Sequence, residues 1–159
     1  MSLSHYVAEL SHRSQLVSDI EESAEKMAKA LNVQWNIWTI VPEHCFVNGR
    51  ASEFTFRVAF AKIAGARIEL ISPFQCKKLY QAYFDVDGEG LPHPCYSYPS
   101  LAGLKKAISD LIQQGHQIIQ QAYTTGVFEF CILETPNQDG IVELFYINGL
   151  SAPDKIIGN

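Results

Sequence analysis

The sequence predicts an α+β fold in which two βαβββ repeats form a curved, incomplete mixed β-barrel with outer helices. Three observations lead to this prediction. The order strand, helix, strand, strand, strand occurs twice along the 159 residues. The last strand of each half carries a carboxylate between apolar residues, Glu69 in the first half and Glu143 in the second. A histidine opens the first strand of each half, His5 or His93.

The first half is predicted to span residues 1–73. A capping box at 18–21 begins its helix, and Ala64 and Gly65 form the tight turn of its last strand pair. Its elements, in order, are a strand at 3–10, a helix at 18–32, a strand at 35–41, a loop or irregular hairpin at 42–53, and two strands within 57–73.

A linker is predicted at 74–91, because its two glycines within Asp-Gly-Glu-Gly interrupt regular structure. The second half, 92–147, repeats the order of the first, and the tail at 148–159 has no counterpart. Its elements are a strand at 93–98, a helix at 101–114, and strands at 117–121, 128–134 and 141–147. The two halves are expected to form one domain overall. The leucines expected in its core are Leu31, Leu70, Leu111 and Leu144.

Composition limits the function classes. A net charge of −5 gives no general attraction to nucleic acid or to anionic lipid. No segment approaches the roughly 18 apolar residues of a membrane span, and the N-terminal residues lack the apolar core of a signal peptide. The four cysteines contain no C-x-x-C pair. These features indicate a cytoplasmic protein with reduced thiols and with neither nucleic-acid nor membrane partners.

One histidine and one glutamate therefore occupy equivalent places in each half. Ionised carboxylates are seldom left in apolar strands unless a partner compensates them. Equivalent positions of two repeats converge by pseudo-twofold symmetry, so we expect His5, Glu69, His93 and Glu143 to meet. Imidazole nitrogen and carboxylate oxygen together suit one divalent ion such as Zn, Ni, Co, Mn or Fe.

Four segments resemble the vicinal oxygen chelate superfamily, nearest its branch of glyoxalase I and methylmalonyl-CoA epimerase-like proteins. RIELISP at 67–73 is similar to the first metal-carboxylate strand of that branch, and GEGLPH at 88–93 is similar to its Gly-Glu-Gly-Leu-His-His segment. GIVEL at 140–144 resembles the closing ligand strand, and LSHYV at 3–7 the opening one. One departure is that Pro92 and Pro94 flank His93 and restrict its backbone.

The resemblance implies a metal-dependent isomerase, epimerase or lyase that abstracts a proton next to a carbonyl. Its metal ligands would be His5, Glu69, His93 and Glu143. Glu143 or Glu69 would double as the base, with Glu43 as a further acidic candidate in the first half. The substrate would be a small carbonyl or thioester compound, as for lactoylglutathione lyase-like or methylmalonyl-CoA epimerase-like enzymes, and the protein a homodimer.

An alternative from a different class is a non-catalytic protein of the bleomycin-resistance type, which binds a small molecule on the same fold. A bound metal would favour the enzyme, and an aromatic cleft without metal would favour the binding protein. A ring-cleaving dioxygenase is disfavoured, because such members draw two histidines and one glutamate from a single half. Here the second half offers only His93 and Glu143 at the matching positions.

Overall fold

The computed structural model describes residues 9–72 and 89–159, with side chains at 13–72 and 93–159. The chain divides into two compact units. Of the described residues, unit 1 holds 9–11, 42–53 and 93–150, and unit 2 holds 12–41, 54–72, 89–92 and 151–159.

Unit 2 is built on a helix and five strands in the order β11-β2-β5-β6-β1. Strand β1 runs parallel to β6, and the other neighbours are antiparallel. Its elements are β1 (Glu9–Val17), α1 (Ile20–Leu31), β2 (Trp35–Ile40), β5 (Phe56–Ile63), β6 (Ala66–Ser72) and β11 (Lys155–Ile157). Asp19 caps α1 by accepting a hydrogen bond from the amide of Glu22. The apolar stripe of α1 packs Ile20 and Ala24 against Trp35.

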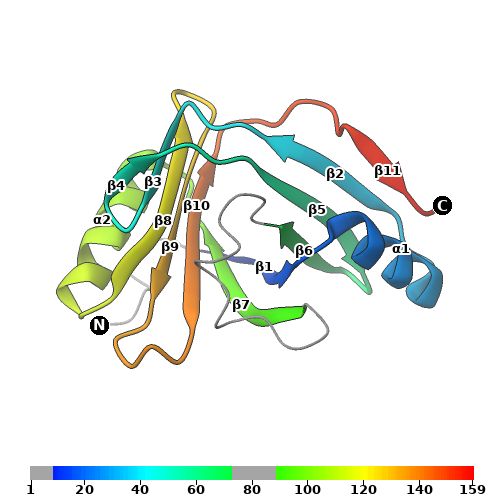
Figure 1. Ribbon diagram of the computed structural model, residues 1–159, viewed down its shortest axis with the longest axis horizontal. Coiled ribbons are helices and arrows are strands. Elements are labelled where there is room, and N and C mark those ends of the chain that lie inside the picture. Colours follow the sequence, from blue (N-terminus) through cyan, green and yellow to red (C-terminus); the bar gives the residue numbers. More distant parts are fainter. Residues whose placement is uncertain (1–8, 73–88) are drawn as a thin grey trace. The chain divides into compact units, whose positions relative to one another are not determined.

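Unit 1 holds the second helix and six strands in the order β7-β10-β9-β8-β3-β4. Strand β7 is parallel to β10, and the remaining pairs are antiparallel. Its elements are β3 (His44–Val47), β4 (Arg50–Ser52), β7 (Glu89–Ser97), α2 (Leu101–Gln113), β8 (Gln117–Thr124), β9 (Phe128–Glu134) and β10 (Ile141–Ile147). Helix α2 lies along one face of this sheet (Figure 1), where Leu104 and Leu111 pack against Leu133 and Leu144.

The two βαβββ repeats are therefore confirmed. The strand order β2-β5-β6-β1 in unit 2 is the order β8-β9-β10-β7 in unit 1, and each order ends in one parallel pair. In neither unit do the described strands close into a barrel. The α+β class, with two helices and incomplete mixed sheets, is correct, and the statement that the chain is one domain stays a prediction.

Each repeat is extended at its outer edge by a strand that lies in the other half of the sequence. The segment predicted as a loop or irregular hairpin forms the β3–β4 hairpin, whose turn residues Asn48 and Gly49 both have positive φ. Strand β3 then pairs with β8 of the second repeat. The C-terminal tail forms β11, which pairs with β2 of the first repeat and buries Ile157. Edge strands attract pairing partners, and here the chain supplies them itself.

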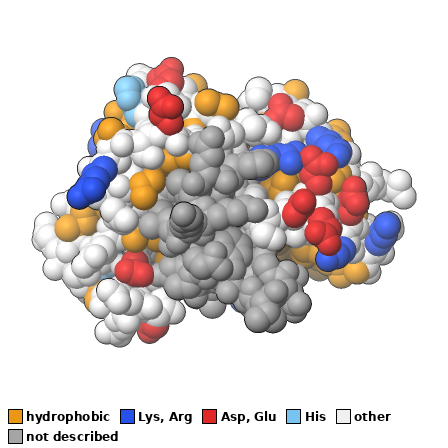
Figure 2. Space-filling model, in the orientation of Figure 1, with side chains coloured by type: hydrophobic (Ala, Val, Ile, Leu, Met, Phe, Trp, Pro, Cys, Tyr) orange, Lys and Arg blue, Asp and Glu red, His pale blue; other side chains and the backbone are white. Residues whose placement is uncertain are grey.

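Glu21 links this tail to the rest of unit 2. Its carboxylate accepts hydrogen bonds from Arg57, at 2.7 Å, and from Lys155. The bond from Lys155, followed by that from Arg57, lowers the pKa of Glu21 below its usual value. Figure 2 shows acidic and basic side chains interspersed on the side of the molecule that carries α1. No helix in the described part of the chain is long and apolar enough to cross a membrane.

Two strand boundaries predicted from the sequence need correction. The opening strand was expected at 3–10, but the described strand is β1, Glu9–Val17, and residues 3–8 lie outside the described chain. Strand β7 begins at Glu89, inside the predicted linker, and continues through Pro92 and Pro94. Pairing with β10 is formed from Cys95 onward, so the missing amides of the two prolines leave that ladder intact.

Among the predicted core leucines, Leu70, Leu111 and Leu144 are buried, as expected. Leu31 is 48% exposed, and the prediction for it is wrong. It is the last residue of α1 and precedes Asn32, which adopts the left-handed conformation that ends the helix.

Candidate functional site

The candidate site of unit 1 consists of His93 and Cys95 on β7 and Glu143 on β10. All three side chains are buried, with exposed fractions of 1%, 0% and 5% respectively. The parallel register places Glu143 directly opposite Cys95. Nε2 of His93 lies 3.4 Å from Oε2 of Glu143, and Sγ of Cys95 lies within 4.8 Å of a Glu143 carboxylate oxygen. A nitrogen, a sulfur and an oxygen donor are thus adjacent on two neighbouring strands.

Strand alternation explains why these residues share one face. Leu144, the next residue on β10, packs into the core under α2, so Glu143 faces the opposite side of the sheet. His93 and Cys95 are two residues apart and therefore lie on a common face of β7. Nitrogen, thiolate and carboxylate are the donor types that transition-type ions take in proteins, so this donor set fits such an ion.

Unit 2 repeats the arrangement with different chemistry. Glu69 on β6 lies directly opposite Ser14 on β1, and both are buried, at 4% and 0% exposed. The hydroxyl of Ser14 donates a hydrogen bond to Oε2 of Glu69. The neighbouring Leu70 packs into the core under α1, as Leu144 does under α2. Glu69 therefore lies on the face of its sheet opposite to Leu70, as alternation along the strand predicts.

The pairing of neighbouring strands shows that the two units are equivalent along whole rows of facing residues. From the first strand of the repeat outward, unit 2 has the row Ser14, Glu69, Phe60, Asn36, and unit 1 has the row Cys95, Glu143, Ile132, Gln120. Each row contains one carboxylate in the last strand and ends in an amide in the second strand. The duplicated carboxylates Glu69 and Glu143 thus occupy equivalent positions.

The register also identifies the residue equivalent to His93. Cys95 corresponds to Ser14, an offset of 95 − 14 = 81, so His93 corresponds to position 93 − 81 = 12. That residue is His12, which lies within β1. From the sequence, His5 was expected to be the equivalent of His93, and His5 lies outside the described residues. The parallel spacings His12-x-Ser14 and His93-x-Cys95 were the sequence signal for both His12 and Cys95.

Glu43, the further acidic candidate, is exposed and directly precedes β3. Its Oε2 accepts a hydrogen bond from the amide of Thr125 at 3.1 Å, and its own amide donates to Oγ1 of Thr124 at 3.3 Å. These contacts fix the start of the β3–β4 hairpin to the turn between β8 and β9.

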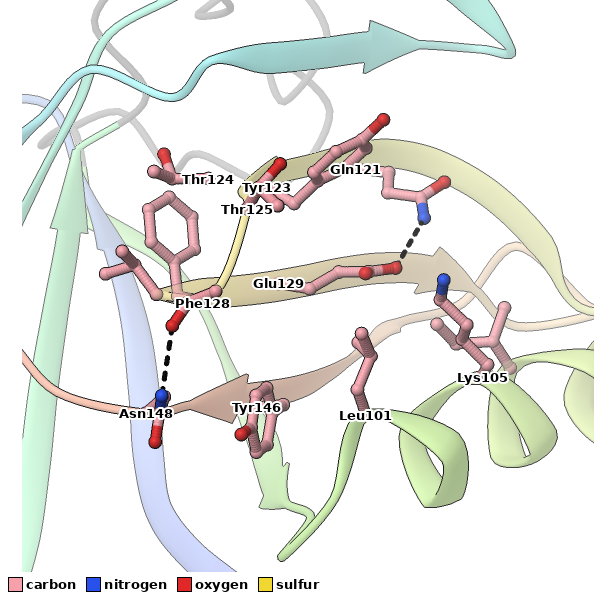
Figure 3. Close-up of a pocket in the computed structure, with 13 residues that line it drawn as sticks. Leu101, Lys105, Gln121, Tyr123, Thr124, Thr125, Phe128, Glu129, Tyr146 and Asn148 are labelled. Atoms are coloured by element: carbon pink, nitrogen blue, oxygen red, sulfur yellow. Dashed lines mark hydrogen bonds between the residues drawn. The ribbon is translucent and has the colours of Figure 1, made fainter.

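A cavity of about 540 Å³ lies on the other face of the unit 1 sheet, beside α2. Figure 3 shows the residues that line it, which come from the start of α2, the β8–β9 turn and the end of β10. Among them are Leu101, Lys105, Tyr123, Glu129 and Tyr146. Sequence reasoning did not single out Glu129, because an isolated acidic residue in a strand gives no sign of what faces it.

Solved structures share the fold of two βαβββ repeats described above. Among solved structures, the chain is similar to the hypothetical protein BH1468 from Bacillus halodurans C-125, with a TM-score of 0.58, 18% identity, and coverage of 91% of this chain and 98% of that one. No protein-family model and no curated protein sequence matches the chain.

Two further similar structures are methylmalonyl-CoA epimerases. The enzyme from Mycobacterium tuberculosis gives a TM-score of 0.52 at 18% identity, covering 88% of each chain. A variant of the Streptomyces coelicolor enzyme, in complex with 2-nitronate-propionyl-CoA, gives a TM-score of 0.55 at 17% identity, covering 91% of this chain and 98% of that one. At these identities the similarity shows the fold alone. The resemblance noted in the sequence is confirmed at that level.

Proposed function

We propose that the protein is a metal-dependent epimerase that moves a proton next to the carbonyl of a CoA thioester. The observation that carries the proposal is the buried pair of His93 and Glu143, 3.4 Å apart, on a fold shared with methylmalonyl-CoA epimerases. A buried carboxylate beside an imidazole is costly to keep unless it binds an ion or performs chemistry.

In the proposed site, His93 and Glu143 of unit 1 and Glu69 of unit 2 hold one divalent ion of the Zn, Ni, Co, Mn or Fe type. The fourth ligand was expected to be His5, and the strand register favours His12 in that role. Bound there, the ion would act as a Lewis acid toward the carbonyl oxygen. Cys95 adds a soft donor next to Glu143, which favours Zn or Co over Mn.

The carboxylates are the proposed proton carriers. Inversion at a carbon requires one group to remove a proton and a second group to return one on the opposite face. Two equivalent carboxylates, one from each repeat, meet this requirement. Glu143 is the proposed base and Glu69 its counterpart, and Ser14 would orient Glu69 through the hydrogen bond that its hydroxyl donates.

Deuterium exchange tests this function. The full chain, loaded with Zn²⁺, Co²⁺ or Ni²⁺, is incubated in D₂O with methylmalonyl-CoA, and exchange of the proton next to the thioester carbonyl is followed by NMR. We expect catalysed exchange that Glu143→Gln abolishes and that Glu25→Gln, on the exposed face of α1, leaves unchanged. A parallel reaction with the hemithioacetal of glutathione separates the epimerase from a glyoxalase-type lyase.

A non-catalytic small-molecule-binding protein is the second candidate. The observation in its favour is the cavity beside α2, to which Tyr123, Phe128 and Tyr146 contribute aromatic rings. If no metal-loaded form catalyses exchange in either substrate and the protein binds an aromatic compound, the binding protein would replace the epimerase as the proposed function.

A further inference from the structure

We propose that the cavity beside α2 is a second ligand site, which takes a zwitterionic small molecule of the amino-acid class. Such a ligand carries an ammonium group, a carboxylate and an apolar body. Each part has a matching feature in the cavity wall: the carboxylate of Glu129, the ammonium group of Lys105 and a set of apolar and aromatic side chains.

Glu129 is the anionic feature. It is only 6% exposed, yet it lines the cavity, between Tyr123 and Tyr146 on the two neighbouring strands. Its one hydrogen bond within the described chain comes from Nε2 of Gln121, at 3.1 Å to Oε1. A single neutral donor compensates a buried carboxylate poorly, and a ligand ammonium group would supply the missing charge.

Lys105 is the cationic feature. It is exposed near the start of α2 and lines the same cavity. The adjacent Lys106 pairs with Asp110 at 3.3 Å, whereas Lys105 makes no salt bridge to any residue in the described chain. Figure 3 shows the side chains of Lys105 and Glu129 reaching toward the same end of the cavity. The opposite charges therefore line one cavity without neutralising each other, as a zwitterion requires.

The apolar body of the ligand would lie against Leu101, Phe128 and Tyr146. A volume of about 540 Å³ is within the usual range of small-molecule pockets, roughly 300–1,000 Å³, and exceeds what a single free amino acid fills. An aromatic amino acid is the fitting probe, because its ring can stack on the tyrosines and its ammonium group can lie near their faces.

This site is separate from the proposed metal site. Glu129 and Tyr146 face α2, while Glu143 lies an odd number of residues from Tyr146 on β10 and faces the other side of the sheet. Substitutions in the cavity should therefore leave metal binding unchanged, and failure of the epimerase proposal would not remove the cavity site.

Calorimetric titration of the full chain tests the proposal with three probes. L-phenylalanine carries both charges, phenethylamine lacks the carboxylate, and 3-phenylpropionate lacks the ammonium group. We expect L-phenylalanine to bind and each of the other two to bind at least roughly tenfold more weakly, since each loses one charge-assisted contact. Equal binding of phenethylamine and L-phenylalanine, or no binding of any probe, would overturn the assignment.

Two variants and their controls locate the site. Glu129→Gln and Lys105→Met should each weaken L-phenylalanine binding roughly tenfold. Lys106→Met, on the next residue of α2, and the exposed Glu53→Gln should not change it. Because Lys105 is exposed, its replacement leaves the fold intact and keeps the test valid if Glu129→Gln is unstable. Unchanged binding in both cavity variants would show that the ligand lies elsewhere.

Discussion

The two units have the same strand order and the same register, but the residues facing their equivalent carboxylates differ. In unit 1, Glu143 lies beside the imidazole of His93 and opposite Cys95. In unit 2, Glu69 lies opposite Ser14 and accepts a hydrogen bond from its hydroxyl. The fold therefore fixes where the carboxylate lies, whereas the first strand of each repeat determines which groups face it.

The largest expected effects concern the cores that hold these carboxylates in place. Leu144 and Leu70 follow the two glutamates, and both are completely buried under a helix. Replacing either by alanine should lower the free energy of unfolding by ~2–5 kcal/mol. Denaturant unfolding measures this, with Leu31→Ala as the control, because Leu31 is 48% exposed and should lose much less. A similar loss in all three variants would show that burial does not distinguish them.

The next effect concerns unequal contributions of the two carboxylates to metal affinity. We expect His93→Ala and Glu143→Gln to weaken Zn²⁺ binding roughly 100-fold, because the first removes a nitrogen donor and the second removes the negative charge of the unit 1 cluster. Glu69→Gln should weaken it less, by roughly tenfold, because its amide oxygen still accepts the hydrogen bond from Ser14 and so stays in place. Competition titration against a chromophoric chelator compares the variants. A smaller loss of affinity in Glu143→Gln than in Glu69→Gln would contradict the larger contribution expected of Glu143.

The third prediction decides between the two histidines of the opening segment. If register determines equivalence, His12→Ala should weaken metal binding roughly tenfold or more, and His5→Ala should leave it nearly unchanged. The same chelator titration measures both variants. A larger loss of metal affinity in His5→Ala than in His12→Ala would show that His5, and not His12, is the equivalent of His93.

The smallest expected effect is specific to unit 2. Bonds from Lys155 and Arg57 lower the pKa of Glu21 in the folded protein. A carboxylate whose pKa is lower in the folded state than in the unfolded state stabilises the fold at pH values above its unfolded-state pKa. That stability is lost as the pH falls through its folded-state pKa. Glu21→Gln should therefore cost less than about 1 kcal/mol at neutral pH, since these pairs are partly exposed. Below the ordinary value of 4.5 the difference from the parent protein should shrink, which urea unfolding at two pH values would check. A difference that grows toward acid pH would contradict this linkage.

Much of the repeat could be predicted from local patterns. Periodic apolar residues gave both helices, and alternation around Glu69 and Glu143 gave their faces, because the following leucines had to point into the core. The turn at Ala64 and Gly65 has positive φ at both residues, as a two-residue hairpin requires.

The remaining features depend on contacts between distant segments. Strand β1 contains His12, Arg13, Ser14 and Gln15 in succession, so it lacks the alternation of apolar residues by which a strand is recognised in a sequence. Its position follows from parallel pairing with β6, and such pairing leaves no local signal. Strand β11 is three residues long and exists because the edge of β2 accepts it. The cavity beside Glu129 likewise requires α2 and the β8–β9 turn to be in place.

The stoichiometry of metal binding to the full chain tests the proposed metal site most directly. We propose that the strand row carrying Glu69 and the strand row carrying Glu143 bind one ion and not two. Isothermal titration of the metal-free protein with Zn²⁺ should give one ion per chain, and both Glu69→Gln and Glu143→Gln should weaken that one binding event. Two ions per chain, each lost in only one of the two variants, would show that the rows bind separately. Absence of binding, or binding that neither variant changes, would contradict the metal site itself.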